Sequence, residues 1–420
     1  MAPFFWFILN QSIVFGLKMP RVIYLKLLLC VVLICSAVSA SAQSRETINV
    51  WHSVGTLDEV LKSLALQFTE QNSAIQINLV SLPYEELKTS VVRTVTNNNA
   101  PDIAIFTSDN AAYADMMRLS RFPLNVLLPY WDKRTLNSLM YDGKLYGLPL
   151  QRSNRLLMFY NKSLVEQPAL TWQQIIQASD GFKQRGILPV GILFREPYWF
   201  AHFATLFATQ FIVEDRPALN SVEMAETLKL FSYLVNQGTI RDDCGYDCVS
   251  RDFYNGDVAY AINGTWAIHE AISALGEDFG IIQLPSFNNK PMKALSSTVM
   301  LTFPNNSWNG VNRNAVRAFS KYLRTKASQI QLAKATFMLP INLDWVNEME
   351  YSAIHKTQVD LLYEAQFMPA KLSYVGIWNA LRKGMLLHHS GQLNELDTSK
   401  YMQKAALDSQ RRMMELDSLR

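Results

Sequence analysis

The chain has 420 residues, of which 49% are hydrophobic and 18% are charged, and its formal net charge is +3. So small a charge on so long a chain excludes the basic surface of a nucleic-acid-binding protein, and no run of like charge predicts a disordered tail. The sequence also has no evident internal repeat.

A secretory signal peptide is predicted over residues 1–42. Two basic residues precede an apolar run at 27–34, and Ala40-Ser-Ala42 is a small-residue cleavage site. Cleavage there makes Gln43 the first residue of an exported, periplasmic protein, and Met19 is an alternative start of translation. The roughly 380 residues that follow are enough for two domains of typical size.

Strands and helices are predicted to alternate in the first part of the chain. Strands are expected at 48–53, 75–80 and 102–106, with helices between them, the second of which covers 84–96. Thr56-Leu-Asp-Glu59 matches a capping box and predicts the start of the first helix. This alternation predicts a largely parallel sheet with helices on both sides.

A second α/β unit is predicted beyond an extended stretch that ends near residue 160. Its expected elements are a helix from Thr171, a helix from Ser221 to Gly238, and strands at 258–262 and 279–283. An extended stretch at 294–304 is the expected return crossing. Two further helices are expected after it, at 315–323 and 399–416. Two crossings between two units predict a cleft with a hinge, near Arg152 and Ser297.

The segment from Phe253 to Trp266 combines a glycine turn, a short apolar strand and an aromatic residue. Gly256 suits a turn with positive φ, Asn263-Gly264 is expected to end the strand, and Trp266 is expected to open the next helix. Ligands of open α/β domains lie at such strand-to-helix junctions. Trp266 is therefore a candidate binding residue, and a tryptophan buried in the core is the alternative.

Two cysteines follow the predicted signal peptide, Cys244 and Cys248 in Asp-Asp-Cys-Gly-Tyr-Asp-Cys. In an oxidising compartment this spacing favours a local disulfide that pins a surface loop. A metal site would need two further ligands, which only the neighbouring aspartates offer. No cofactor and no metal ion are expected.

Several short phrases occur in a characteristic order along the chain. They are Val50-Trp-His-Ser53, Ala100-Pro-Asp-Ile103, Asp142-Gly-Lys-Leu-Tyr-Gly-Leu-Pro149, Phe159-Tyr-Asn-Lys162, Thr171-Trp172, Glu196-Pro-Tyr198, Ile262-Asn-Gly-Thr-Trp266 and Ile377-Trp-Asn-Ala-Leu-Arg382. With these phrases the chain resembles the extracellular solute-binding proteins of ABC importers, in the sugar-binding group that is similar to maltose-binding protein. The likeness extends over nearly the whole predicted mature chain.

The resemblance implies an α/β fold of the type II periplasmic-binding-protein kind, with two α/β lobes joined by several crossovers around a ligand cleft. The N-terminal lobe is expected at 43–152 with 297–345, and the C-terminal lobe at 153–296 with 346–420. The implied protein is a monomer without enzymatic activity. It carries a sugar or a sugar-like solute to the permease subunits of an ABC importer in the membrane.

Nine residues are candidates for ligand contacts. By resemblance they include Asp109, Asn154, Glu196, Tyr198, Trp266 and Trp378. The residues themselves add Trp51 and Ser53, which end the first strand beside a helix N-terminus, and Arg382, which lies four residues after Trp378 on one helix face. Aromatic side chains suit the apolar faces of sugar rings, and carboxylates and amides suit their hydroxyl groups.

Some residues depart from the maltose-binding pattern. Asn154 stands where those members have an acid and Asn379 where they have a tyrosine, which argues against a maltodextrin. Tyr84-Glu85 is similar to the glycerol-3-phosphate-binding branch, and Arg152 and Arg155 could contact a phosphate or, alternatively, form ion pairs or face solvent. Glycerol 3-phosphate or a glycerophosphodiester is therefore the alternative ligand. A ligand sensor and a secreted glycoside hydrolase are the alternative functions.

Overall fold

The computed structural model describes residues 45–53, 55–127, 136, 139–349, 352–368 and 370–418. The predicted signal peptide, its cleavage site and the alternative start at Met19 lie outside these residues. The chain divides into Met1–Glu46 and a compact unit, Thr47–Arg420. Among the helices of the described residues, none is both long enough and apolar enough to cross a membrane.

The described strands form one large sheet and two hairpins. Their bounds are β1 Glu46–His52, β2 Ile75–Ser81, β3 Ile103–Thr107, β4 Met140–Tyr141, β5 Lys144–Leu145, β6 Leu148–Asn161, β7 Leu188–Gly191, β8 Ile212–Val213, β9 Arg216–Pro217, β10 Val258–Gly264, β11 Phe279–Ile282, β12 Leu295–Thr302 and β13 Gln366–Phe367. The nine-stranded sheet has the order β2-β1-β3-β12-β6-β10-β7, with β11 beside β6 and β13 beside β12.

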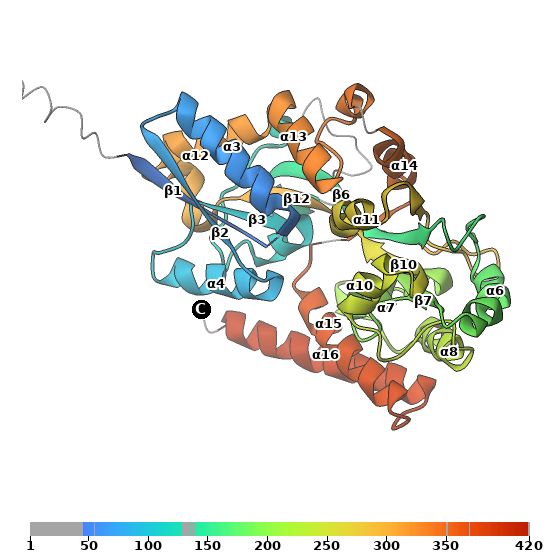
Figure 1. Cartoon of the computed structure of the whole chain (residues 1–420). Helices are drawn as coiled ribbons and strands as arrows, with labels where there is room; N and C mark the ends of the chain where they lie inside the picture. The colour runs from blue at the N-terminus through green and yellow to red at the C-terminus, as the bar shows by residue number, and fades with distance from the viewer. Residues whose placement is uncertain are drawn as a thin grey trace, which may run out of the picture. The chain divides into compact units, whose positions relative to one another are not determined.

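The described helices surround this sheet (Figure 1). Their bounds are α3 Asp58–Gln71, α4 Tyr84–Thr96, α6 Trp172–Gln184, α7 Pro197–Ala204, α8 Val222–Asn236, α9 Tyr246–Val249, α10 Arg251–Tyr254, α11 Ile268–Leu275, α12 Arg313–Leu323, α13 Lys326–Thr336, α14 Ser352–Leu362, α15 Ser373–His389 and α16 Glu395–Ser418. The alternation of strands and helices that the sequence predicts is therefore present.

The sheet is mixed: the parallel pairing predicted from the first strands of the chain is present between β1 and β3, whereas the centre of the sheet is antiparallel. β1 pairs with β3 and β10 pairs with β7 in parallel, as βα units require. The long strands β6 and β12, however, run antiparallel to each other, and β12 is also antiparallel to β3 and β6 to β10. The two strands have opposite directions because the chain passes from the first end of the sheet to the second through β6 and returns through β12.

The first helix begins differently from the prediction. A 3₁₀ turn, η1 (Gly55–Leu57), precedes α3, and Leu57 occupies the N-cap position without a side-chain hydrogen bond. Glu59 forms an ion pair with Lys62 at 2.8 Å instead of completing a capping box with Thr56. The Leu57 side chain is fully buried, so burial of this residue sets the helix entry.

The caps of two later helices are as the sequence predicts. The Thr171 hydroxyl accepts a hydrogen bond from the Gln174 amide at 3.1 Å, which closes a capping box at the start of α6. The Ser221 hydroxyl likewise accepts from the Met224 amide at 3.1 Å at the start of α8. Gly238, just beyond α8, has the positive φ of +64° that favours glycine.

Two separate cores lie at the two ends of the sheet. In the first core, α3, α12 and α13 pack on one face of the β1 and β3 end, and α4 packs on the opposite face (Figure 1). In the second core, α6, α7, α8, α15 and α16 cover one face of the β10 and β7 end, and α9, α10 and α11 cover the other. Alternate residues of β6 serve these two faces, because side chains alternate along a strand.

The crossing strands are tied together by polar groups. Asn154 of β6 lies opposite Ser297 of β12, and its side-chain amide donates to the Ser297 hydroxyl at 3.0 Å. Arg152 is buried and donates to the Ile341 carbonyl from Nε at 3.0 Å and from Nη2 at 2.8 Å. Arg155 is also buried and donates from Nη2 to the Gln358 carbonyl at 2.6 Å. Their burial contradicts the alternative that these arginines face solvent.

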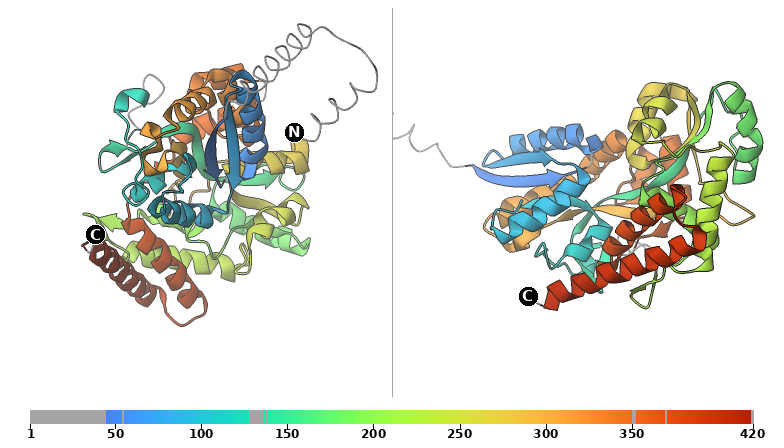
Figure 2. Two further views of the ribbon diagram at one scale, coloured as in Figure 1. Left: turned by 90° about the vertical axis from the view of Figure 1, so that its left-hand side faces the viewer. Right: turned by 90° about the horizontal axis from the view of Figure 1, so that it is seen from below.

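The last two helices form a close pair that packs on α8 (Figure 2). Gly376 and Gly384 of α15 face α16, and a Cβ atom at either position would lie within 3 Å of the Ser409 or Met402 side chain. Glycine at these two positions permits the close approach of the helices. The second core thus includes the C-terminal part of the described chain.

Candidate functional site

The second core presents a row of aromatic side chains at the N-terminus of α7. Glu196 is the N-cap residue of this helix and Pro197 its first residue. Tyr198 and Trp199 have ring centroids 5.8 Å apart, and Trp199 and Trp266 have centroids 6.2 Å apart. Trp199 is buried and donates to the Ile262 carbonyl at 2.7 Å, so it belongs to the core. Tyr198 and Trp266 are half-buried and line its edge.

Trp266 lies directly over the backbone at the end of β10. The strand ends at Gly264, within the predicted Asn263-Gly264 terminus and two residues beyond the predicted range 258–262, and Trp266 occupies the 3₁₀ turn η6 (Thr265–Ala267) before α11. A Cβ atom on Gly264 would lie 2.3 Å from the indole ring. Glycine is therefore required here by the close approach of the ring, and the Trp266 residue as a whole is half-buried.

The first core contributes a polar group of residues opposite this row. Asp109 is half-buried in the 3₁₀ turn η2 (Ser108–Tyr113), which follows β3. The Asn110 amide donates to the Tyr84 hydroxyl and to the Thr107 hydroxyl, each at 2.9 Å. Burial raises the pKa of Asp109, while hydrogen bonding with Thr107 and the charge of Lys88 work in the opposite direction.

Asp109 and Tyr198 bring the two cores together. Burial raises the pKa of Tyr198 well above its ordinary value, and the nearby charge of Asp109 raises it further. The phenol therefore stays protonated, and it donates to the Leu295 carbonyl at 2.8 Å. The charge of Asp109 in the first core thus acts on the Tyr198 phenol of the second core.

A buried histidine fixes Tyr198 from behind. The His202 side chain is fully buried, its Nδ1 is 2.7 Å from the Tyr198 carbonyl, and its Nε2 is 3.0 Å from the Leu295 amide. These partners assign the neutral tautomer that donates from Nδ1 and accepts at Nε2. Burial lowers the pKa of His202 to about 4, so the ring is neutral at pH 7.

Helix α15 supplies Trp378 and Arg382 on one face, as predicted. Arg382 does not cover the Trp378 ring. Instead its guanidinium contacts the Glu196 carboxylate at 3.3 Å. Trp378 packs against Tyr374 and Phe211, with ring centroids 5.7 Å and 6.4 Å away. It lines a pocket of about 130 Å³, which is smaller than the roughly 300 Å³ of the smallest typical ligand pockets.

The other predicted residues are more scattered. Trp51 is half-buried and packs against the α4 side of the first core, and Ser53 is half-buried just beyond β1. Asn154 is engaged with Ser297 within the crossing. Asp109, Tyr198 and Trp266 therefore stay the main candidates for ligand contacts.

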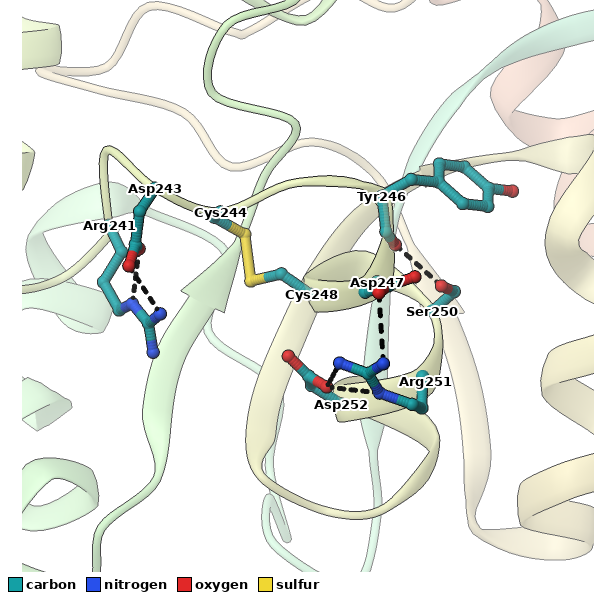
Figure 3. A network of polar contacts seen from close by, with 9 residues as sticks. All are labelled: Arg241, Asp243, Cys244, Tyr246, Asp247, Cys248, Ser250, Arg251 and Asp252. Atoms are coloured by element: carbon teal, nitrogen blue, oxygen red, sulfur yellow. Dashed lines mark hydrogen bonds and ion pairs between the residues drawn. A yellow bond between two sulfur atoms is a disulfide. The ribbon is translucent and has the colours of Figure 1, made fainter.

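A disulfide closes the loop from Cys244 to Cys248 (Figure 3), and both cysteines belong to the cluster against which Trp266 packs. Cys244 and Cys248 are bonded, with Cα atoms 5.4 Å apart, and Tyr246 lies between them. The Tyr246 ring points away from the disulfide. Burial raises its pKa, and hydrogen bonding with Trp266 and Asn263 works in the opposite direction.

Residues 63–357 match the family model of the bacterial extracellular solute-binding proteins. The chain belongs to this family. Two solved structures share its fold. One is the maltose/maltodextrin-binding domain MalE from Bdellovibrio bacteriovorus bound to maltotriose, with TM-score 0.78 and 23% identity over 87% of this chain and 100% of that one. The other is the GacH receptor of Streptomyces glaucescens, solved unliganded and with acarbose, with TM-score 0.77 and 19% identity over 86% of this chain and 97% of that one.

The family and the fold of this solute-binding protein are thus as the resemblance implies. Reasoning from the sequence did not find Lys88, His202 or Tyr246 as parts of the site. Lys88 lies one helical turn beyond Tyr84, and Tyr246 lies between two cysteines, so both had a local signal. His202 had none, because its role depends on the Leu295 amide of a distant strand.

Proposed function

We propose that this solute-binding protein binds a carbohydrate, as a monosaccharide or oligosaccharide, in the periplasm and delivers it unaltered to the permease of an ABC importer. Asp109 and Tyr198 carry this proposal, because a carboxylate whose charge acts on a half-buried tyrosine combines the two residue types that suit the hydroxyl groups and the apolar faces of a sugar. The maltotriose and acarbose bound by the two similar structures support a sugar as the ligand class.

Two lobes that close on the solute are part of the proposal. The two cores support this part of the proposal, because each core combines chain segments that the crossing strands separate in the sequence. The lobe boundaries then follow the predicted ranges 43–152 with 297–345 and 153–296 with 346–420, with a hinge near Arg152 and Ser297. A solute that contacts both lobes favours the closed state, whereas a solute that contacts only one lobe leaves the equilibrium unchanged.

A phosphate-bearing ligand receives less support. Arg152 and Arg155 donate to backbone carbonyls at the crossing, and Arg382 contacts Glu196. These three arginines therefore have partners within the protein. Neutral hydroxyl groups need no such cation, which favours a sugar over glycerol 3-phosphate.

The test is a calorimetric and tryptophan-fluorescence titration of the mature protein with glucose, maltotriose, acarbose and glycerol 3-phosphate. Saturable binding of one of the sugars, without release of reducing sugar over hours, is the expected result. Binding of glycerol 3-phosphate alone would establish the alternative ligand. Hydrolysis of an oligosaccharide would contradict transport binding, and mass spectrometry of solute that co-purifies gives an independent identification.

A further inference from the structure

We propose that the Cys244–Cys248 disulfide is a positioning element of the ligand site, which holds the Tyr246 loop in the cluster on which Trp266 packs and so fixes the position of the Trp266 ring. The proposal rests on the proposed function, in which Trp266 contacts the solute. It assigns to the disulfide a role beyond fastening a surface loop.

The disulfide belongs to the same packed cluster as Trp266. Both cysteines are buried, with 4% and 6% of their surface exposed, and they pack with Val249 and Phe253 in the cluster that Trp266 borders. Gly191 lies beneath the disulfide, where a Cβ atom would be only 3.1 Å from the Cys248 carbonyl oxygen. The loop therefore packs closely against β7, and a shift of the loop toward β7 would cause a steric clash.

A buried amide connects this loop to the backbone under Trp266. The Asn263 side chain is fully buried and donates to the Val249 carbonyl at 2.9 Å. Its oxygen accepts from the Gly264 amide at 2.7 Å. Gly264 is the residue over which the indole ring lies. Displacement of the residues after Cys248 would therefore be transmitted to Trp266 through one side chain.

Tyr246 itself is held from two directions. The Ser250 hydroxyl donates to its carbonyl at 2.7 Å, and Arg251 contacts Asp247 at 3.1 Å, which fixes the turn that carries it (Figure 3). Tyr246 is 43% exposed, and its interaction with Trp266 opposes the effect of burial on its pKa. An exposed ring that is fixed in advance loses less side-chain freedom on binding than one that is not.

The experiment uses the full mature protein and the double variant Cys244→Ser/Cys248→Ser. In each background, the Trp266 fluorescence is isolated by subtracting the spectrum of the matching Trp266→Phe protein. Acrylamide quenching of this signal reports the accessibility of the ring. We expect the quenching constant to rise about twofold in the double variant, with circular dichroism unchanged, and the affinity for the sugar identified by titration to fall about two- to tenfold.

A second pair of variants keeps the test decisive if the double-serine protein does not fold. Tyr246→Ala retains the disulfide and should also increase the quenching of Trp266, while Tyr233→Ala, at a tyrosine of α8 with 44% exposure, should not. Unchanged Trp266 quenching in Tyr246→Ala, or in a folded double-serine variant, would overturn the proposal. The quenching needs no ligand, so failure of every sugar to bind would contradict the proposed function alone.

Discussion

The two sides of the site differ in how firmly their side chains are held. On the second core, His202 and Leu295 fix Tyr198, and Gly264 and the disulfide loop support Trp266, so the aromatic faces are set by buried contacts. On the first core, Asp109 is half-buried and Tyr84 is 41% exposed. We therefore call the aromatic residues of the second core the rigid side of the candidate site, and the group around Asp109 in the first core its polar side.

The largest expected effect concerns His202 and the rigid side. Its folded pKa of about 4 is below the ordinary value of 6.5, so the unfolded chain binds the extra proton first as the pH falls. The neutral ring makes its full contribution to the free energy of unfolding above pH 6.5. This contribution, about 3 kcal/mol, is lost as the pH falls toward 4. Urea unfolding at pH 7 and pH 5 measures this loss.

The variant His202→Gln serves as the control for this pH effect. It should be less stable than the parent at pH 7 because it replaces both ring hydrogen bonds imperfectly. The difference in stability between parent and variant should shrink as the pH falls from 7 to 5. A constant difference would show that the ring does not titrate in this range.

The next effect concerns Asp109 and the polar side. Asp109→Asn should weaken sugar binding by about 1.5 to 3 kcal/mol if the carboxylate accepts from a sugar hydroxyl.

The same variant should also change the pH dependence of stability. Because burial raises the pKa of Asp109, this carboxyl contributes stability that is complete below pH 3.8 and is lost as the pH rises through the folded pKa. The asparagine variant should therefore be more stable than the parent at pH 7, as thermal unfolding will measure.

A matched control for Asp109 is Asp102→Asn. The Asp102 carboxylate accepts from the Asn49 amide at 2.8 Å and from the Asn312 side chain at 3.0 Å, so it has a structural role in the first core. This variant should lose stability and retain affinity. The opposite pattern in both variants would reverse the roles of the two carboxylates.

The Trp266→Ala variant tests the rigid side directly. We expect a loss of about 1 to 3 kcal/mol in the free energy of sugar binding, because stacking on the indole face is removed. Isothermal titration calorimetry measures this loss, and Trp308→Phe in the first core should leave the affinity unchanged. An unchanged affinity with lowered stability in Trp266→Ala would assign the ring to the core.

The smallest effect is expected for the Glu196–Arg382 pair. Its distance is 3.3 Å, and the Arg382 side chain is 57% exposed. Exposed ion pairs contribute at most about 1 kcal/mol. A double-mutant cycle with Glu196→Gln and Arg382→Gln should give a coupling energy for folding below that value, and it should shrink at 1 M salt. A coupling well above it would show that the pair is desolvated.

The sequence predicts the elements better than their connections. The caps of Thr171 and Ser221 are correct because their partners lie three residues away in the chain. The capping box at Thr56 has the same spacing but fails, since burial of Leu57 decides the helix start. Nothing local indicated that β12 would insert beside β3 in the opposite direction or that Tyr246 would reach Trp266, because both depend on tertiary packing.

The place of β12 in the sheet has a consequence for the order in which the chain can fold. The Thr302 hydroxyl of β12 bonds to the Ala104 carbonyl of β3, 198 residues earlier in the chain. At about 5 to 20 residues per second, synthesis of that interval takes roughly 10 to 40 seconds. The nascent N-terminal segment therefore leaves the ribosome with one strand edge unpaired, and this edge is open to chaperones until the return strand emerges.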